Sequence, residues 1–227
     1  MTTAKTALVI GASRGLGLGL VERLTEDGWE VTATVRDPAK VPVALKATGA
    51  RVEALEMTNL ESMDALKITL QQQTFDLLFI NAGISGPLGY DTDGASAADI
   101  GELFIVNAVA PIRLAQRLAE NVPDSGVIAF MSSVLGSVTM PEGSPMALYK
   151  ASKAALNSMT NTFVVELARP QLTVLSMHPG WVKTDMGGDG ASLDVATSTR
   201  GMVDVVTAQL GKGGHRFLDY KGETISW

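Results

Sequence analysis

Tyr149 and Lys153 form the pair of residues in this sequence best suited to proton transfer. They stand four positions apart, and this spacing brings two side chains onto the same face of a helix. A tyrosine hydroxyl has an ordinary pKa of about 10, so its use as an acid or base near neutral pH needs a nearby cation that favours phenolate. We therefore expect Lys153 to supply that cation and Tyr149 to act as the general acid or base.

Ser133 and Asn107 are polar residues next to apolar runs, and both could complete such a site. Ser133 follows the apolar run Val127–Phe130, where its hydroxyl could bind a substrate oxygen close to the tyrosine. Neighbours on a strand point to opposite faces, so Ser132 is the competing choice and only one of the two can face the site. Asn107 follows the apolar run Leu103–Val106, which indicates a buried polar role or a structural hydrogen bond.

A glycine-rich turn follows the first apolar run of the chain. Its glycines are spaced G-x-x-x-G-x-G, and a helical pattern begins at the last one. Such a turn lets the backbone approach a pyrophosphate, and the helix N-terminus offers unpaired N–H groups and the positive end of its dipole. The alternative is a tight strand-to-helix turn without a ligand. The candidate nucleotide-binding residues of the turn are Gly11, Ser13, Arg14, Gly15, Leu16 and Gly17.

The end of the second apolar run indicates which nucleotide the turn would accept. An NAD site places an acidic residue about twenty residues beyond the glycines, on the ribose 2′-hydroxyl, but Val35 stands there. Arg36 follows, and Arg14 lies in the glycine turn, so two guanidiniums could hold a 2′-phosphate by charge-assisted bonds. We expect NADP (NADPH) rather than NAD. The alternatives are that both arginines are solvated, or that a shifted strand end brings Asp37 into this position.

Further candidate contacts stand where other strands end. Asn81, Ala82 and Gly83 follow a buried run at the carboxyl edge, where ligands bind in open α/β sheets, and small residues there would admit the adenine ribose. Glu56 and Met57 could border the adenine, although Glu56 could equally be a solvated strand end.

Short apolar runs alternate along the chain with longer helical patterns, which predicts parallel strands joined by helices. Runs such as Leu77–Ile80 are apolar throughout and indicate strands buried on both faces. The sequence predicts an α/β Rossmann fold, a doubly wound seven-stranded parallel sheet with helices on both faces. The expected strands are Thr6–Gly11, Glu30–Val35, Ala50–Glu56, Phe75–Asn81, Gly126–Ser132, Leu172–His178 and Arg216–Tyr220. The expected helices are Gly17–Asp27, Leu60–Gln73, Ala97–Asn121, Ala147–Arg169 and Val195–Leu210.

Composition excludes several classes of function. The 227 residues are 46% apolar with a net charge of −6, which favours one globular domain over 1–227 and opposes nucleic-acid binding. No apolar run reaches membrane-spanning length, no signal segment is recognised, and the lack of cysteine suits the cytoplasm. The only histidines, His178 and His215, stand in different elements, so we expect neither a metal site nor a Ser-His-Asp triad.

Taken together, these motifs resemble the short-chain dehydrogenase/reductase family across nearly the whole chain. The resemblance rests on the glycine turn, Asn81-Ala82-Gly83, Asn107, Ser133, Tyr149-x-x-x-Lys153 and Pro179-Gly180. It implies that Tyr149 passes a proton to a carbonyl oxygen while hydride moves from nicotinamide C4. It also implies that Lys153 binds the nicotinamide ribose, Asn107 holds a water in the proton relay and Ser133 orients the substrate. Pro179, Gly180, Val182 and Thr184 would contact the nicotinamide amide and the phosphates.

Two departures from the family pattern concern Ser133 and Glu56. Sixteen positions separate Ser133 from the tyrosine, a longer loop than in many members, so Ser137 and Ser144 are further alternatives to the active serine. Glu56 stands where relatives often have an aspartate.

The stretch after His178 and the ending Phe217–Trp227 are similar to the C-factor-like and carbonyl-reductase-like subgroup. The expected activity is NADPH-dependent reduction of a small carbonyl or oxidation of an alcohol, with a short substrate loop over about 181–200. The alternative is a nucleotide-binding signalling protein with little turnover. Pairing of the helices Ala97–Asn121 and Ala147–Arg169 would give a homodimer.

Overall fold

Seven parallel strands form the centre of the molecule. The computed structural model describes residues 4–86, 92–140 and 146–227. The strands follow the order β3-β2-β1-β4-β5-β6-β7, and every neighbouring pair is parallel. This confirms the predicted doubly wound Rossmann sheet. The strands are β1 Thr6–Ile10, β2 Glu30–Val35, β3 Arg51–Ala54, β4 Leu77–Ile80, β5 Val127–Met131, β6 Thr173–His178 and β7 Gly214–Asp219.

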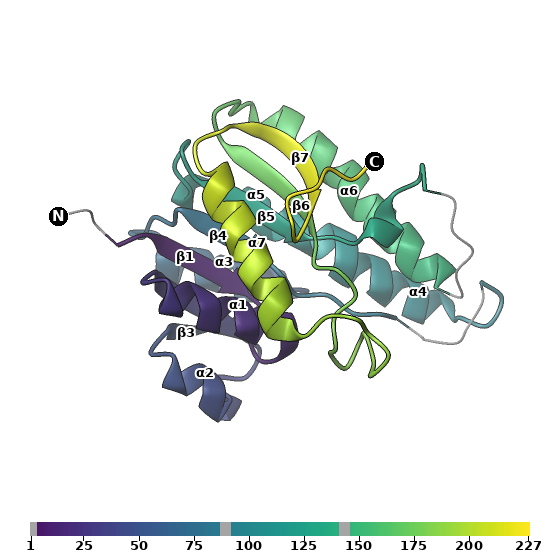
Figure 1. Ribbon diagram of the computed structural model, residues 1–227, viewed down its shortest axis with the longest axis horizontal. Coiled ribbons are helices and arrows are strands. Elements are labelled where there is room, and N and C mark those ends of the chain that lie inside the picture. Colours follow the sequence, from purple (N-terminus) through teal and green to yellow (C-terminus); the bar gives the residue numbers. More distant parts are fainter. Residues whose placement is uncertain (1–3, 87–91, 141–145) are drawn as a thin grey trace.

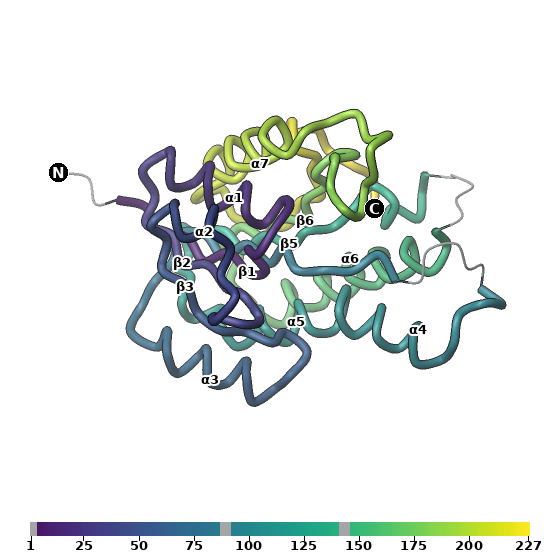
Figure 2. Tube along the Cα trace, turned by 90° about the horizontal axis from the view of Figure 1, so that it is seen from below, coloured from purple at the N-terminus to yellow at the C-terminus, as the bar shows by residue number. Residues whose placement is uncertain are grey.

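Helices cover both faces of this sheet (Figure 1). Seen along the layers, α1 and α7 lie on one side, and α3, α4, α5 and α6 lie on the other (Figure 2). The helices are α1 Gly15–Glu26, α2 Val43–Ala47, α3 Leu60–Leu70, α4 Ala97–Phe104, α5 Ala110–Leu118, α6 Ala147–Leu167 and α7 Val195–Gln209. Within the described ranges, no helix is both long and apolar enough to span a membrane.

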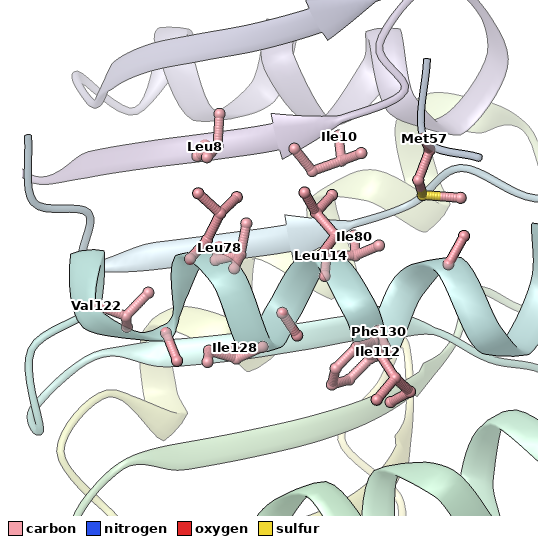
Figure 3. Packing of buried hydrophobic residues seen from close by; sticks show 14 of the residues in the cluster. Leu8, Ile10, Met57, Leu78, Ile80, Ile112, Leu114, Val122, Ile128 and Phe130 are labelled. Carbon is pink, nitrogen blue, oxygen red and sulfur yellow. The ribbon is translucent and has the colours of Figure 1, made fainter. Parts of the chain in front are cut away.

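Alternate residues of the strands supply two hydrophobic clusters, one on each face. On one face, Leu8, Leu78 and Ile128 from three neighbouring strands pack toward α5 (Figure 3). On the other face, Val9 and Phe79 pack in a cluster with residues of α1 and α7. Since β1, β4 and β5 are buried on both faces, their carboxyl ends are held rigidly at one edge.

The expected helix Ala97–Asn121 is helical throughout but changes geometry near its middle. A π-helical segment, Ile105–Val109, joins α4 to α5, and a 3₁₀ turn, Ala119–Asn121, ends the stretch. Pro111 explains the irregularity, because it has no N–H to donate to the carbonyl of Asn107, four residues earlier. Periodicity did not predict this change, and it also missed α2.

Other boundaries differ from the expectation by a few residues. The first helix begins at Gly15 rather than Gly17, and the last strand is Gly214–Asp219 rather than Arg216–Tyr220. The last strand begins earlier because Gly213 and Gly214 adopt positive φ values of 63° and 75°, which lets the chain turn directly into pairing with β6.

Acid is expected to destabilise the fold through the two histidines. Burial lowers the pKa of His178 and of His215 to about 4. In the unfolded chain, the pKa of a histidine is about 6.5. Between these two pH values the unfolded state binds more protons than the folded state. The stability that the neutral histidines contribute is therefore complete above pH 6.5 and is lost as the pH falls toward 4. Urea unfolding at pH 7 and pH 4.5 should show a loss of about 2 kcal/mol for each histidine.

A variant carrying His178→Gln and His215→Gln isolates this effect from that of the carboxylates. Its free energy of unfolding should fall less between the two pH values than that of the wild type. Equal losses in both proteins would remove the histidines as the cause.

Candidate active site

The predicted site residues gather at the carboxyl edge of the sheet. The segments that follow β1, β4, β5 and β6 meet there because these four strands are parallel neighbours. Between β1 and β4 the strand order reverses, since β2 and β3 continue from β1 in the other direction. Ligands of open α/β sheets bind at this kind of switch point.

The turn requires glycine at Gly11 and at Gly17. Gly11 has a φ of 82°, and a Cβ at Gly17 would lie 2.0 Å from the Gly11 carbonyl oxygen. Arg14 precedes α1 without a side-chain cap, so the first N–H groups of the helix are left for another acceptor. This combination of close backbone and an uncapped helix start fits the pyrophosphate of a dinucleotide.

Asn81, Ala82 and Gly83 connect this turn to the proposed catalytic residues. The Asn81 side chain donates to the Gly11 carbonyl oxygen at 2.9 Å, and Ala82 lies where a Cβ on Gly11 would come within 2.8 Å. A Cβ on Gly83 would lie 3.5 Å from the Lys153 Nζ. Asn81 therefore holds the turn by a hydrogen bond, while Gly83 borders the buried lysine.

Arg14 is bound by a loop that follows β6. It forms an ion pair with Asp185, and both side chains are about three-quarters exposed. Thr184, the preceding residue, has its Cγ2 3.6 Å from the position of a Cβ on Gly15. The predicted phosphate-binding residues Gly15 and Thr184 thus face one another across the start of α1.

Arg36 is exposed and forms no ion pair among the residues that the structure describes. Asp37 does not replace the missing acid, because its side chain accepts from the Ala39 N–H at 3.0 Å and pairs with Lys40 at 3.3 Å. The guanidinium of Arg36 is therefore available to an anionic ligand.

Glu56 and Met57 have structural partners. A Glu56 carboxylate oxygen accepts from the Thr58 N–H at 3.2 Å and from its hydroxyl at 2.9 Å. Met57 is buried within a core cluster. Their contact with adenine stays a prediction.

The segment after β6 is organised by its own hydrogen bonds. Gly180 has a φ of 82°, which lets the chain turn directly after Pro179. Val182 is buried and pairs with Leu193. Trp181, beside it, is 58% exposed.

Tyr149 and Lys153 lie together on α6. The Lys153 Nζ is 5.7 Å from the centre of the Tyr149 ring and donates to the Met131 carbonyl oxygen at 2.9 Å. Burial lowers the pKa of Lys153 to about 8. Burial also raises the pKa of Tyr149 to about 12, against the opposing effect of a hydrogen bond with Ser133.

The expected lowering of the Tyr149 pKa by Lys153 is therefore wrong for this structure. The ammonium group lies over the ring and is engaged by a backbone carbonyl, and loss of water around the hydroxyl has the larger effect on the pKa. Near neutral pH, Tyr149 is a protonated phenol and can donate a proton.

Among the candidate serines that the structure describes, Ser133 is the one that contacts Tyr149. Ser132 instead donates to Asn157 Oδ1 at 2.7 Å, and Ser137 bonds with Thr139 at 3.2 Å. Ser144 lies outside the described residues. The choice between neighbouring serines depends on which residue of the helix each one meets.

Asn107 is fully buried in the π-helical segment. Its side chain accepts from the Ile84 N–H at 2.8 Å and donates to the Ile84 carbonyl oxygen at 2.8 Å and the Ser152 hydroxyl at 3.1 Å. Ser152 in turn donates to the Tyr149 carbonyl oxygen at 2.7 Å. These contacts favour the structural hydrogen bond, and a role in a proton relay stays a prediction.

Sequence reasoning missed Asn157 and Asp185. Asn157 is four positions beyond Lys153, so its place on the same helix face as Tyr149 and Lys153 was predictable from periodicity. The pairing of Asp185 with Arg14 had no local signal, since 171 positions separate the two residues.

Comparison with known proteins identifies the family. Residues 5–192 match the family described as short chain dehydrogenase. The chain belongs to the short-chain dehydrogenase/reductase family. It is accordingly an oxidoreductase, as the sequence predicted.

Similar proteins include both kinds that the sequence led us to expect, C-signal and carbonyl reductases. C-signal of Myxococcus xanthus is 32% identical over 154 residues, which cover 67% of this chain and 92% of that protein. A putative short-chain dehydrogenase/reductase from Burkholderia multivorans, solved with bound NADP, superposes with a TM-score of 0.95 at 38% identity, covering 99% of this chain and 100% of the other. A carbonyl reductase from Pseudomonas aeruginosa PAO1 in complex with NADP gives 0.92 at 36% identity, with the same coverage.

Proposed function

We propose that this protein is an NADPH-dependent carbonyl reductase that acts on small aldehydes, ketones or quinones. The observation that carries the proposal is the hydrogen bond between Tyr149 and Ser133, with the Lys153 Nζ 5.7 Å from the centre of the Tyr149 ring. Similar proteins solved with NADP support the choice of nucleotide.

We further infer a single domain over 1–227, whose loop at about 181–200 borders the substrate. We also infer a homodimer, which sedimentation would test.

Residues at the carboxyl edge are available to hold NADPH. The glycine turn and Thr184 would bind the pyrophosphate, and Arg14 and Arg36 would bind the 2′-phosphate. Gly180 and Val182 would border the nicotinamide, and Lys153 its ribose. NADPH, when bound, supplies the hydride for the carbonyl carbon.

The protein's own side chains would manage the carbonyl oxygen. Ser133 donates a hydrogen bond that holds this oxygen near the Tyr149 hydroxyl. Tyr149, protonated at neutral pH because burial raises its pKa, transfers its proton to the oxygen as negative charge develops there. Charged Lys153 stabilises the phenolate that remains. The protonated phenol suits reduction better than alcohol oxidation, which needs the phenolate first.

Replacing Arg36 by alanine is expected to weaken NADPH binding by about 10- to 100-fold, because charge-assisted hydrogen bonds are worth about 1.5 to 3 kcal/mol. NADH has no 2′-phosphate, so its dissociation constant should change less than 2-fold. Fluorescence titration of wild type and variant with both nucleotides measures the difference.

Arg51→Ala is the matched control, since Arg51 is an exposed arginine at the start of β3 that pairs with Glu53. It should leave both affinities unchanged. Equal weakening of NADPH and NADH by Arg36→Ala would contradict the selectivity proposal.

The second candidate function is nucleotide-dependent signalling, favoured by the similarity to C-signal. The placement of Tyr149 beside Ser133 and beneath the buried Lys153 ammonium favours the enzyme, because a binding protein has no need of a proton donor held in this way.

Titration of the purified protein with NADPH and NADH, followed by an absorbance assay with a panel of carbonyl compounds, tests the proposal. Tight NADPH binding with turnover is expected. Binding without turnover on any carbonyl would favour the signalling role, and failure to bind either nucleotide would overturn both.

A further inference from the structure

We propose that Asn157 is a positioning residue that fixes Ser133 against Tyr149. The inference rests on the proposed reductase function, because it assigns Asn157 a role in holding the reacting groups of that site. Within the part of the chain that the structure describes, Asn157 forms no hydrogen bond with Ser133 or Tyr149, and it acts through the turn that carries the serine.

Asn157 continues the row of catalytic residues along α6. Tyr149, Lys153 and Asn157 follow one another at intervals of four, so all three lie along one face of the helix. Asn157 is 4% exposed. A buried amide of this kind is costly unless both its donor and its acceptor are used.

Its two polar atoms bind the two ends of one short turn. The Asn157 oxygen accepts from the Ser132 hydroxyl at 2.7 Å, and its nitrogen donates to the Gly136 carbonyl oxygen at 3.4 Å. Ser133 lies between these anchor points and begins the 3₁₀ turn Val134–Gly136. Asn157 therefore spans the segment from which the Ser133 hydroxyl projects.

The same turn lies directly on the backbone of α6. A Cβ on Gly136 would lie 2.9 Å from the Lys153 carbonyl carbon, so the turn and the helix are in contact one helical turn before Asn157. On its other side, the Ser132 N–H donates to the Met177 carbonyl oxygen at 2.8 Å. These contacts hold the turn between β6 and the helix.

This clamp matters because Ser133 and Tyr149 come from different elements. The Ser133 hydroxyl accepts from the Leu135 N–H at 3.2 Å within its own turn and bonds with Tyr149 on the helix. A turn that slides along α6 would carry the serine away from the phenol. Misplacement of a positioned group by about 1 Å costs on the order of 100-fold in rate.

Asn157→Leu is expected to lower kcat for carbonyl reduction by about 10- to 100-fold, with the NADPH dissociation constant changed less than 2-fold. A second readout is the pH profile of alcohol oxidation. Because the Ser133 hydrogen bond lowers the pKa of Tyr149, its loss should move the limb on which oxidation rises with pH to higher pH. A residue that only stabilised the fold would leave this limb in place.

The double variant Ser132→Ala/Asn157→Leu keeps the test valid if the single variant folds poorly. It removes the donor and the acceptor of the bond between positions 132 and 157 together, which avoids a buried hydroxyl without a partner. Its thermal midpoint should stay close to that of the wild type while kcat stays low.

Asn161→Leu is the matched control, because this amide stands on the same helix but bonds with His215 at 3.0 Å, away from the turn. It should retain wild-type kcat and pH profile. Equal kcat for the Asn157 and Asn161 variants, or wild-type kcat in the double variant, would overturn the inference. Absence of turnover in the wild type would instead reject the proposed function.

Discussion

Tyr149→Phe is expected to lower kcat for carbonyl reduction by about 10²- to 10⁴-fold, the usual contribution of a general acid. The substitution removes the hydroxyl that bonds with Ser133 and keeps the ring beneath Lys153. The NADPH dissociation constant should therefore stay within 2-fold of the wild type. Single-turnover absorbance at 340 nm together with fluorescence titration would separate the chemical step from binding.

Tyr220→Phe serves as the control, since it removes a tyrosine hydroxyl from the segment after β7. It should retain kcat. Turnover by Tyr149→Phe at the wild-type rate would reject Tyr149 as the proton donor.

Lys153→Met is expected to stabilise the fold while it abolishes most activity. Lys153 is 3% exposed, and burial lowers its pKa from 10.5 to about 8. At about 1.4 kcal/mol per pH unit, the charge costs roughly 3 kcal/mol of stability at pH 7. Loss of the hydrogen bond to Met131 offsets part of this, so we expect a net gain of about 1 to 2 kcal/mol.

The pH dependence of this gain gives the sharper test. Between pH 8 and pH 10 the unfolded chain holds the Lys153 proton while the folded protein releases it. The free energy of unfolding of the wild type therefore rises with pH over this range. The advantage of Lys153→Met, measured by urea unfolding, should therefore shrink from pH 7 to pH 10. Lys67→Met, at an exposed position of α3, should give no gain at either pH.

The activity of the wild type should follow the same titration. The charged form of Lys153 predominates below about pH 8, so kcat for reduction should decline above that pH. Lys153→Met should be slower than the wild type by about 100-fold or more at pH 7, because the phenolate loses its cation. A variant with wild-type kcat, or one that is less stable than the wild type at pH 7, would contradict this account of the buried charge.

Local patterns in the amino-acid sequence predicted the architecture and named the residues of the candidate site. Alternation of apolar runs and helical patterns is a local property, and it predicted the parallel sheet because each strand is buried on both faces. The glycine spacing predicted the turn because only glycine allows the contact of Gly17 with Gly11. The interval from Tyr149 to Lys153 placed both residues on one helix face.

Packing of the elements set the side-chain partners that are distant from one another in the chain. Helix α6 determined that Ser132 meets Asn157 and that Ser133 meets Tyr149. Packing against Ile84 gave the Asn107 side chain a structural role, and the loop after β6 supplied Asp185 to Arg14. Burial raised the pKa of Tyr149, where residue type and spacing predicted the reverse. Desolvation and side-chain partners arise only when the elements pack together, so no local pattern records them.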